Sequence, residues 1–282
     1  MSVVAVVGAG TMGNGIAHVF AQSGWDTTLI DVSRDALDKA LATIGGNLDR
    51  QVKKGTATPE QKSATLARIK TGTALTGVAG AELVVEAATE HPQTKFEIFK
   101  AIDQHASPGA ILGSNTSSIS ITTIAAQTRR PAQVIGMHFM NPVPVMQLVE
   151  VIRGLETSDP TTARVIEVSK ALGKIPVEVN DAPGFVSNRV LMPMINEAVF
   201  CVEQGVATPD AVDTVMKLGM NHPLGPLALA DLIGLDVCLA ILQVLHRDLG
   251  EDKYRPSPLL AKMVAAGRLG RKSKRGFYDY RG

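Results

Sequence analysis

The hydrophobic residues in the N-terminal part of the chain form short apolar runs separated by amphipathic stretches. The first run, Val3–Val7, contains five small or β-branched residues and predicts a strand buried on both faces. Further strands are predicted at residues 27–30, 83–87, 110–114, 134–138, 147–152 and 175–179. Apolar residues recur at helical spacing between most of these runs. Strands that alternate with helices predict an α/β fold with a doubly wound, mainly parallel sheet.

The C-terminal part of the chain has a different pattern. After Asp181-Ala182-Pro183-Gly184 the apolar spacing is helical, and glycines and prolines interrupt it. We expect a first domain over residues 1–182 and a smaller, all-helical domain over residues 183–282. Much of the second domain is apolar, as in residues 227–245, which predicts association between subunits.

A glycine-rich segment follows the first predicted strand. Gly8, Gly10 and Gly13 have G-x-G-x-x-G spacing, and the apolar face of the next helix extends to Gly24. In this context Gly8 would form a tight turn, Gly10 would let a pyrophosphate approach the backbone, and Gly13 would let the helix pack on the strand. The free N–H groups of the helix would face the phosphates. The segment predicts a Rossmann-type dinucleotide-binding unit.

Asp31 ends the second predicted strand, 18 residues after Gly13. A carboxylate at this place binds the ribose 2′-hydroxyl of NAD and repels the 2′-phosphate of NADP. A second interpretation is an acid that caps the following turn. We expect NAD to be the cofactor.

Charge and composition exclude several other classes of function. Lys and Arg number 28 and Asp and Glu number 27, without the basic excess that nucleic-acid or membrane-surface binding requires. Cys201 and Cys238 lie in apolar stretches without C-x-x-C spacing, so we expect neither a disulfide framework nor a metal site. No apolar run is long enough to span a bilayer, and no targeting peptide is expected before the first strand. These features predict a soluble, cytoplasmic protein without nucleic-acid or membrane partners.

Polar residues follow or end several predicted strands, at the edge where a doubly wound sheet binds its ligands. They are Asp31, Glu90, Asn115, Ser117 and His138.

His138 has a further feature, because Pro142 and Pro144 follow it and favour a turning path back beside its strand. The next strand contains Glu150 among aliphatic residues, and a buried carboxylate needs a partner. In an alcohol oxidation, His138 would take the hydroxyl proton and Glu150 would orient the imidazole. A purely structural ion pair of Glu150 fits the spacing equally well.

With these residues the sequence resembles the 3-hydroxyacyl-CoA dehydrogenases, in particular the short bacterial 3-hydroxybutyryl-CoA type, over essentially the whole chain. Besides the glycine-rich segment, the resemblance rests on residues 114–118 (SNTSS), 138–146 (HFMNPVPVM), 148–151 (LVEV), 183–189 (PGFVSNR) and 276–278 (GFY). It implies NAD-dependent interconversion of a short-chain (S)-3-hydroxyacyl-CoA, such as 3-hydroxybutyryl-CoA, and the 3-ketoacyl-CoA, such as acetoacetyl-CoA.

The resemblance also implies roles for individual residues. His138 matches the family's general acid/base and Glu150 its partner. Ser117 and Asn188 match residues that bind at the reacting oxygen and carbonyl, and Lys54 matches a lysine that contacts coenzyme A. The matched cofactor positions are Gly8, Gly10, Thr11, Met12, Gly13, Asp31, Glu90, Lys95, Asn115 and Asn141. The helical domain is implied to form a homodimer.

A purely structural role also fits five of these residues. Lys54 follows Arg50 and Lys53 at a predicted helix end, where cations complement the helix dipole. Asn188 fits a link between helices, and Ser117 fits the chemistry of a turn. Glu90 and Lys95 fit charges in the first turn of a helix.

The sequence departs from the family pattern at two places. Met140 stands where relatives often carry an aromatic residue, which affects the acyl pocket, and Lys274-Arg275 replaces a glycine-containing stretch.

Two other functions fit parts of the sequence. Dehydrogenases of free 3-hydroxy acids share the first domain but use a catalytic lysine on the helix between the domains. No lysine occurs in residues 181–204. A protein that only binds NAD would have no reason to hold His138, Glu150, Ser117 and Asn188 together.

Overall fold

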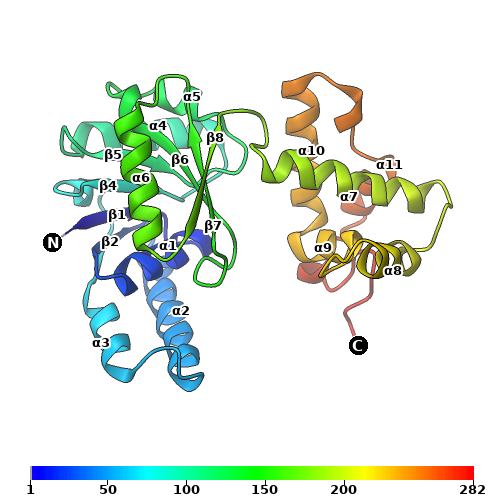
Figure 1. Ribbon diagram of the computed structural model, residues 1–282, viewed down its shortest axis with the longest axis horizontal. Coiled ribbons are helices and arrows are strands. Elements are labelled where there is room, and N and C mark those ends of the chain that lie inside the picture. Colours follow the sequence, from blue (N-terminus) through cyan, green and yellow to red (C-terminus); the bar gives the residue numbers. More distant parts are fainter. Residues whose placement is uncertain (1) are drawn as a thin grey trace. The chain divides into compact units, whose positions relative to one another are not determined.

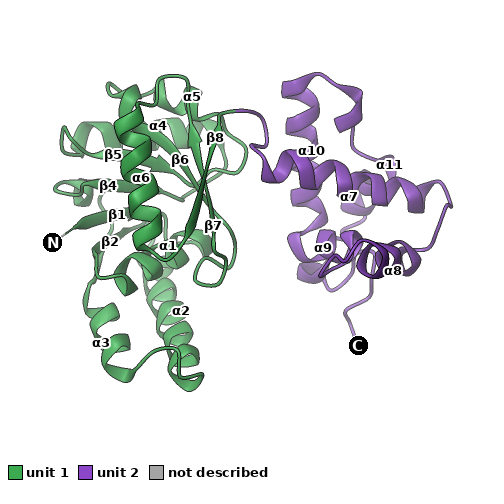
Figure 2. Cartoon of the chain, in the orientation of Figure 1, with its two compact units in different colours: residues 1–181 green, residues 182–282 purple. Residues whose placement is uncertain are grey.

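The computed structural model of the protein describes residues 2–282, which form two compact units (Figure 2). Unit 1 extends to Asp181, and unit 2 comprises Ala182–Gly282. The boundary expected from the sequence lies one residue further along the chain. Each unit has its own hydrophobic core and is described by itself.

The described part of unit 1 contains an eight-stranded sheet with the order β3-β2-β1-β4-β5-β6-β7-β8 (Figure 1). All neighbouring strands are parallel except β6 and β7, which run antiparallel. The doubly wound, mainly parallel sheet predicted from the sequence is confirmed. The strands are β1 (Val3–Val7), β2 (Asp26–Ile30), β3 (Ile69–Gly72), β4 (Leu83–Glu86), β5 (Ile111–Ser114), β6 (Val134–Phe139), β7 (Leu148–Arg153) and β8 (Ile175–Asn180).

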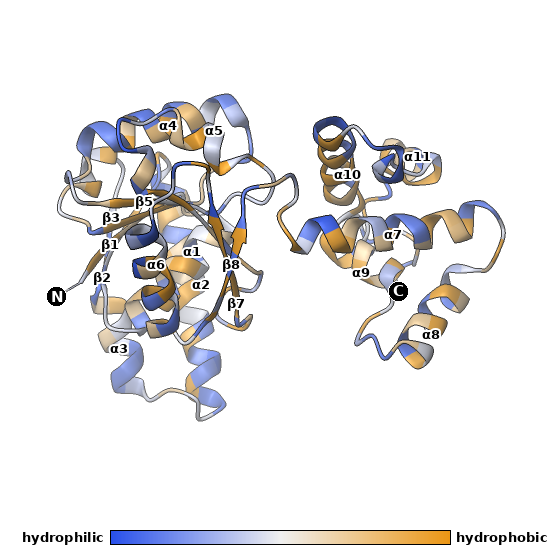
Figure 3. Ribbon diagram, turned by 45° about the horizontal axis from the view of Figure 1, so that its top comes forward, coloured by the Kyte–Doolittle hydropathy of each residue, from blue (hydrophilic) through white to orange (hydrophobic). Residues whose placement is uncertain are grey.

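The interior position of β1 explains its unbroken apolar run. Val4, Ala5 and Val6 are all completely buried. Val4 and Val6 belong to the core that the helices of one face complete, and Ala5 points to the opposite face because successive side chains alternate. Figure 3 shows the same arrangement over unit 1, where the strands are largely orange and the helices carry both colours.

Helices connect the strands and cover both faces of the sheet. Ser33 and Thr58 cap two of them. The Ser33 hydroxyl accepts a hydrogen bond from Ala36 N (3.2 Å), and Thr58 forms a reciprocal capping box with Gln61. The helices of unit 1 are α1 (Thr11–Gln22), α2 (Arg34–Lys53), α3 (Pro59–Ala67), α4 (Pro92–His105), α5 (Ile121–Ala125) and α6 (Asp159–Ala171).

Two short elements, β3 and α5, were not expected from the sequence. β3 is an edge strand of four residues in which Ile69 alone is buried, so it has no apolar run. α5 has five residues, which is too short to display a helical period.

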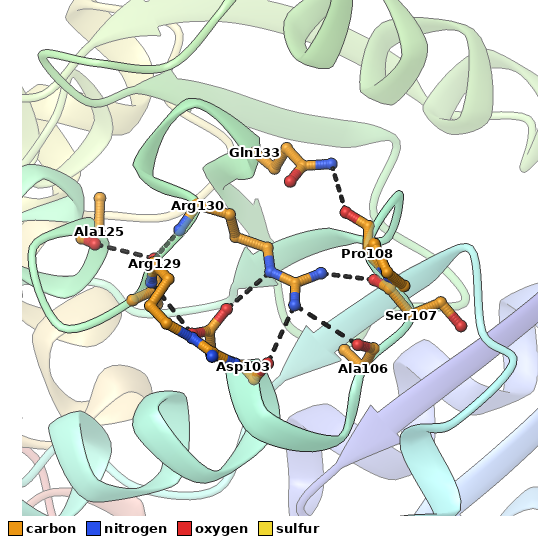
Figure 4. Close-up of polar contacts among 9 residues, drawn as sticks. Asp103, Ala106, Ser107, Pro108, Ala125, Arg129, Arg130 and Gln133 are labelled. Atoms are coloured by element: carbon orange, nitrogen blue, oxygen red, sulfur yellow. Dashed lines mark hydrogen bonds and ion pairs between the residues drawn. The ribbon is translucent and has the colours of Figure 1, made fainter.

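Asp103 and two arginines, together called the Asp103 brace, hold the C-terminal end of α4 (Figure 4). The buried Asp103 carboxylate accepts hydrogen bonds from Arg129 Nε (3.1 Å) and Arg130 Nε (2.6 Å). Arg130 also donates to Asp103 O (2.9 Å), a carbonyl that the last helical turn leaves unpaired, and to Ser107 O (2.5 Å). Burial opposes ionisation of Asp103, but the hydrogen bonds from Arg129 and Arg130 outweigh it and hold its pKa below the ordinary value.

Unit 2 is helical in its described residues, and its C-terminal segment is fastened by two buried acids. The Asp231 carboxylate accepts hydrogen bonds from Phe277 N and Tyr278 N (both 3.0 Å). Asp213 accepts one from the Tyr278 hydroxyl (2.8 Å), and burial together with this acid raises the pKa of Tyr278. The helices are α7 (Ser187–Glu203), α8 (Pro209–Gly219), α9 (Pro226–Ile233), α10 (Leu235–Leu249) and α11 (Pro258–Ala265).

Membrane-spanning potential is limited to one pair of helices. Among residues 2–282, no single helix has the length and apolar composition needed to cross a bilayer. The pair α9 and α10, bent by 97°, meets that requirement only when its two helices are counted together.

Candidate active site

The glycine-rich loop between β1 and α1 has the close contacts that its spacing predicts. Gly8 has a positive φ of 104°, which favours glycine, and makes the turn out of the strand. A Cβ on Gly13 would lie 1.7 Å from Gly8 O, so α1 can approach the strand this closely only with glycine there. A Cβ on Gly10 would meet no atom within 4 Å. The backbone at Gly10 is thus open to a ligand at the start of α1.

The start of α1 also suits an anion. The helix begins at Thr11, after Gly10, with no side-chain cap and no acidic residue in its first turn. Its first N–H groups have no partner within the helix, and the helix dipole is positive at this end. The arrangement matches a phosphate-binding helix N-terminus.

Asp31 lies after β2, beside this loop. Its Oδ2 accepts a hydrogen bond from Ala9 N (2.8 Å), and its Oδ1 accepts one from Ser33 N (2.9 Å). The carboxylate therefore fastens the glycine-rich loop and also supports the turn into α2. The turn-capping interpretation is compatible with the ribose-binding one, since a carboxylate has lone pairs for further donors.

A cavity of about 170 Å³ lies next to the loop, at the carboxyl ends of the strands. One lining residue, Lys95, belongs to a buried ion pair that the sequence pattern did not predict. Lys95 Nζ lies 2.5 Å from Glu86 Oε2, and both side chains are almost completely buried. Glu86 also accepts hydrogen bonds from Ser114 Oγ and Ala88 N (both 2.9 Å). The lining residues are Met12, Ala87, Ala88, Thr89, Glu90, Lys95 and Asn115.

A detectable signal for Glu86 was present in the sequence. Glu86 ends an otherwise apolar strand, which is the pattern that identified Glu150 as a buried acid. Lys95, nine residues further on, is its counter-charge. The first-turn helix charge considered for Lys95 is not what the structure shows, because α4 turns this side chain inward and leaves it 1% exposed.

Glu90, which lines the cavity, is hydrogen-bonded to Ser117. Glu90 Oε1 accepts hydrogen bonds from Ser117 N (2.6 Å) and Ser117 Oγ (2.9 Å), while Oε2 accepts one from Thr116 Oγ1 (2.8 Å). Asn115 uses its side-chain oxygen to accept a hydrogen bond from Phe139 N (3.0 Å). These contacts join the segments after β4 and β5 to the C-terminal end of β6.

His138 and Glu150 occupy directly opposite positions on the antiparallel strands β6 and β7. His138 Nδ1 lies 2.7 Å from Glu150 Oε2, and the residues are 8% and 2% exposed. The turning path expected from the two prolines is observed, and it brings the side chains into contact. A carboxylate at Nδ1 fixes the orientation and tautomer of an imidazole, which prepares the ring for proton exchange at Nε2.

Three other candidate residues lie elsewhere. Lys54 is exposed at the C-terminal end of α2, where Arg50 and Lys53 also lie. Asn141 is exposed in the connection between β6 and β7. Asn188 is a buried residue in the first turn of α7, in unit 2.

Both units match family models over nearly their whole length. Residues 3–182 match the 3-hydroxyacyl-CoA dehydrogenase NAD binding domain, and residues 184–280 match the 3-hydroxyacyl-CoA dehydrogenase C-terminal domain. These are the two segments into which the structure divides the chain.

Individual proteins are similar to this chain over its full length. A protein of Deinococcus radiodurans named "Probable 3-hydroxybutyryl-CoA dehydrogenase" is 58% identical over 275 residues, covering 98% of this chain and 99% of the relative. The 3-hydroxybutyryl-CoA dehydrogenase of Bradyrhizobium diazoefficiens is 54% identical over 279 residues, covering 99% and 95%. The crystal structure of (S)-3-hydroxybutyryl-CoA dehydrogenase PaaH1 from Ralstonia eutropha matches with a TM-score of 0.97 and 52% identity over the whole of both chains. The chain belongs to the 3-hydroxyacyl-CoA dehydrogenase family, whose first domain binds NAD.

Proposed function

We propose that the protein interconverts a short-chain (S)-3-hydroxyacyl-CoA, such as 3-hydroxybutyryl-CoA, and the 3-ketoacyl-CoA, such as acetoacetyl-CoA, with NAD as cofactor. The names of its relatives support this substrate class. The observation that carries the chemistry is the 2.7 Å contact between His138 and Glu150 at the edge of the sheet that holds the cavity.

The residues around the glycine-rich loop fit NAD. The open backbone at Gly10 and the uncapped start of α1 suit a pyrophosphate, and Asp31 suits a ribose with a free 2′-hydroxyl. Glu90, Lys95, Asn115 and Asn141 are the other positions that we assign to the cofactor site. Bound NAD supplies a hydride acceptor for the alcohol carbon.

The chain's own contribution to the reaction is proton transfer. In the oxidation, His138 accepts the hydroxyl proton at Nε2 while Nδ1–H donates to Glu150. The carboxylate holds the ring in this tautomer and stabilises the imidazolium that forms. In the reduction, the same imidazolium returns the proton to the carbonyl oxygen.

Three residues are proposed to bind substrate. Ser117 hydrogen-bonds the reacting oxygen, and its position beside Glu90 supports this role because the contact fixes the Ser117 backbone near the cavity. Asn188 binds near the substrate carbonyl, and Lys54 contacts a phosphate of coenzyme A. These roles come from the family resemblance.

A homodimer formed through unit 2 is also proposed. The support is a set of large apolar side chains that unit 2 leaves exposed, among them Val190 on α7 and Leu218 on α8, which are 67% and 82% exposed. Light scattering of the purified protein measures its molar mass and therefore distinguishes a monomer from a dimer.

The proposed activity is tested by NADH oxidation with acetoacetyl-CoA. We expect turnover with acetoacetyl-CoA and none with free acetoacetate, since coenzyme A is part of the recognised substrate. His138→Gln should lower kcat by ~10²–10⁴-fold and leave NADH binding nearly unchanged. Glu150→Gln should lose much of the same activity, and the double variant should be little worse than His138→Gln alone. Independent, multiplying losses would show that Glu150 does not serve His138.

A further inference from the structure

The connection between β6 and β7, residues 140–147, is anchored from the side of α1. This segment, called the β6–β7 loop, joins the strands of His138 and Glu150 and carries Asn141. Its Val143 is only 2% exposed and belongs to the core of unit 1. A Cβ on Gly15 of α1 would lie 2.9 Å from Val143 Cβ, so the loop approaches the helix too closely for any larger residue there.

Lys174 anchors the same loop from the start of β8. Its Nζ donates hydrogen bonds to Val143 O (2.5 Å) and Met146 O (2.7 Å). The next residue continues the attachment, because Ile175 N donates to Gln147 O (2.8 Å). The loop is thus held at two of its carbonyls by one ammonium group.

This use of a lysine is unusual. Lysine side chains normally extend into water, whereas Lys174 is 8% exposed and forms no ion pair with any described carboxylate. Burial accordingly lowers the pKa of Lys174. An apolar residue would fill the same space without this desolvation, so the ammonium is explained by its two carbonyl partners.

The hydrogen bonds of Lys174 do not serve to bury the neighbouring loop residues Val145 and Met146. Val145 and Met146 are 72% and 41% exposed, although the Met146 carbonyl accepts a hydrogen bond from Lys174 Nζ. The anchoring therefore fixes the path of the backbone. That path determines where Asn141 lies and how β6 and β7 are joined.

We infer that Lys174 is a positioning residue, which holds the β6–β7 loop so that His138, Glu150 and Asn141 keep their catalytic geometry. The inference rests on the proposed function of His138 and Glu150. A positioning role differs from a stabilising one, because it lowers turnover in protein that remains folded. Displacement of a reacting group by about 1 Å can cost ~10²-fold in rate.

The test compares Lys174→Met with Lys170→Met, which removes an exposed lysine from α6 in the same part of the chain. We expect kcat with acetoacetyl-CoA to fall about 10- to 100-fold in folded Lys174→Met and to stay at the wild-type value in Lys170→Met. Wild-type kcat in folded Lys174→Met would overturn the inference. Lys174→Gln, which keeps one donor group, serves if Lys174→Met does not fold.

Gly15→Ala tests the same loop from the opposite side without touching Lys174. Its new methyl group must displace Val143, so we expect a lower kcat at a temperature where Gly15→Ala is still folded. Because both changes move one loop, the double variant of Gly15→Ala with Lys174→Met should be about as slow as the slower single variant. If the two losses of kcat multiply in the double variant, the two substitutions do not act through the same loop.

A readout without turnover separates this inference from the proposed function. If wild-type protein does not reduce acetoacetyl-CoA, the proposed function fails, and amide hydrogen exchange still tests the anchoring. The N–H groups of Val145 and Met146 donate to Pro142 O (both 2.9 Å). Faster exchange of residues 140–147 in Lys174→Met, with the rest of unit 1 unchanged, supports the anchoring; unchanged exchange overturns it.

Discussion

Acidification is expected to destabilise unit 1 through His18, a histidine in α1. Its side chain is completely buried, and neither ring nitrogen has a hydrogen-bond partner among the described residues. Burial lowers the pKa of His18 from 6.5 to about 4. The nearby Gln22 side chain opposes this shift in part, and the positive charge of Lys174 reinforces it.

The sign of the effect follows from the two protonation states. Folded protein keeps His18 neutral down to about pH 4, whereas the unfolded chain protonates it below about pH 6.5. Between these values the unfolded state binds more protons, so the free energy of unfolding falls as the pH is lowered. The contribution is complete above the unfolded pKa and is lost towards the folded one. At about 1.4 kcal/mol per pH unit, the loss reaches about 2 kcal/mol at pH 5 and about 3 kcal/mol at pH 4.

Trp25 provides a signal for this measurement. It is the one tryptophan of the chain, and its ring packs edge-on against Phe20 of α1 with centroids 5.2 Å apart. Urea unfolding followed by Trp25 fluorescence, at about pH 7.5 and about pH 5, gives the acid sensitivity of unit 1. We expect His18→Leu to reduce that sensitivity by about 2 kcal/mol, because leucine fills a similar volume without titrating.

Ile16→Val is the matched control in the same helix. It removes one buried methylene group and should cost ~0.5–1.5 kcal/mol at both pH values, with the acid sensitivity of the wild type retained. Equal acid losses in wild-type protein and His18→Leu would refute the assignment of this effect to His18.

Three further predictions concern contacts described above. Asp31→Asn, which keeps one acceptor for Ala9 N, should lower the preference for NADH over NADPH, measured as the ratio of kcat/KM values, about tenfold or more. Lys54→Ala should raise KM for acetoacetyl-CoA severalfold but leave KM for acetoacetyl-N-acetylcysteamine unchanged, since that thioester has no phosphates. Arg130→Met should lower the free energy of unfolding by about 3 kcal/mol in urea titrations, because it removes the buried partner of Asp103.

Each of these predictions has a control. Asp35→Asn removes an exposed acid from the start of α2 and should keep the wild-type cofactor preference; an equal effect there would remove the special role of Asp31. Lys39→Ala, earlier in α2, should leave both KM values unchanged, and a matching rise would reduce Lys54 to a general charge effect. Adding Asp103→Leu to Arg130→Met should recover part of the lost stability. A further loss of stability would contradict the account of the brace.

Much of the fold was predictable because its central strands are buried on both faces. Such strands have continuous apolar runs, as β1 does, and the run is visible without knowledge of the partners. β3 was missed for the converse reason, since a strand at the sheet edge buries one residue in four and depends on β2 for its conformation. A four-residue strand without an apolar run is therefore not visible in the local sequence pattern.

Some contacts of the candidate site were likewise predictable from the sequence, and others were not. His138 and Glu150 could be paired in advance because the chain between them is short and contains two turn-forming prolines. The partner of Lys95 was not predictable from helical position, because its inward direction depends on how α4 packs on β4. Asp103 is another such case, as its arginines lie on a segment more than twenty residues away.

The antiparallel pairing of β6 and β7 constrains how this protein can change during evolution. Side chains on a strand alternate between faces, so a slip of one residue would place Val149 or Val151 opposite His138. The connecting segment cannot easily accommodate an insertion, because Val143 is buried in the core and Lys174 binds the backbone carbonyls of Val143 and Met146. Substitutions in this segment are therefore tolerable in a way that insertions and deletions are not. We therefore expect the length of this segment to stay constant wherever the pairing of His138 with Glu150 is kept.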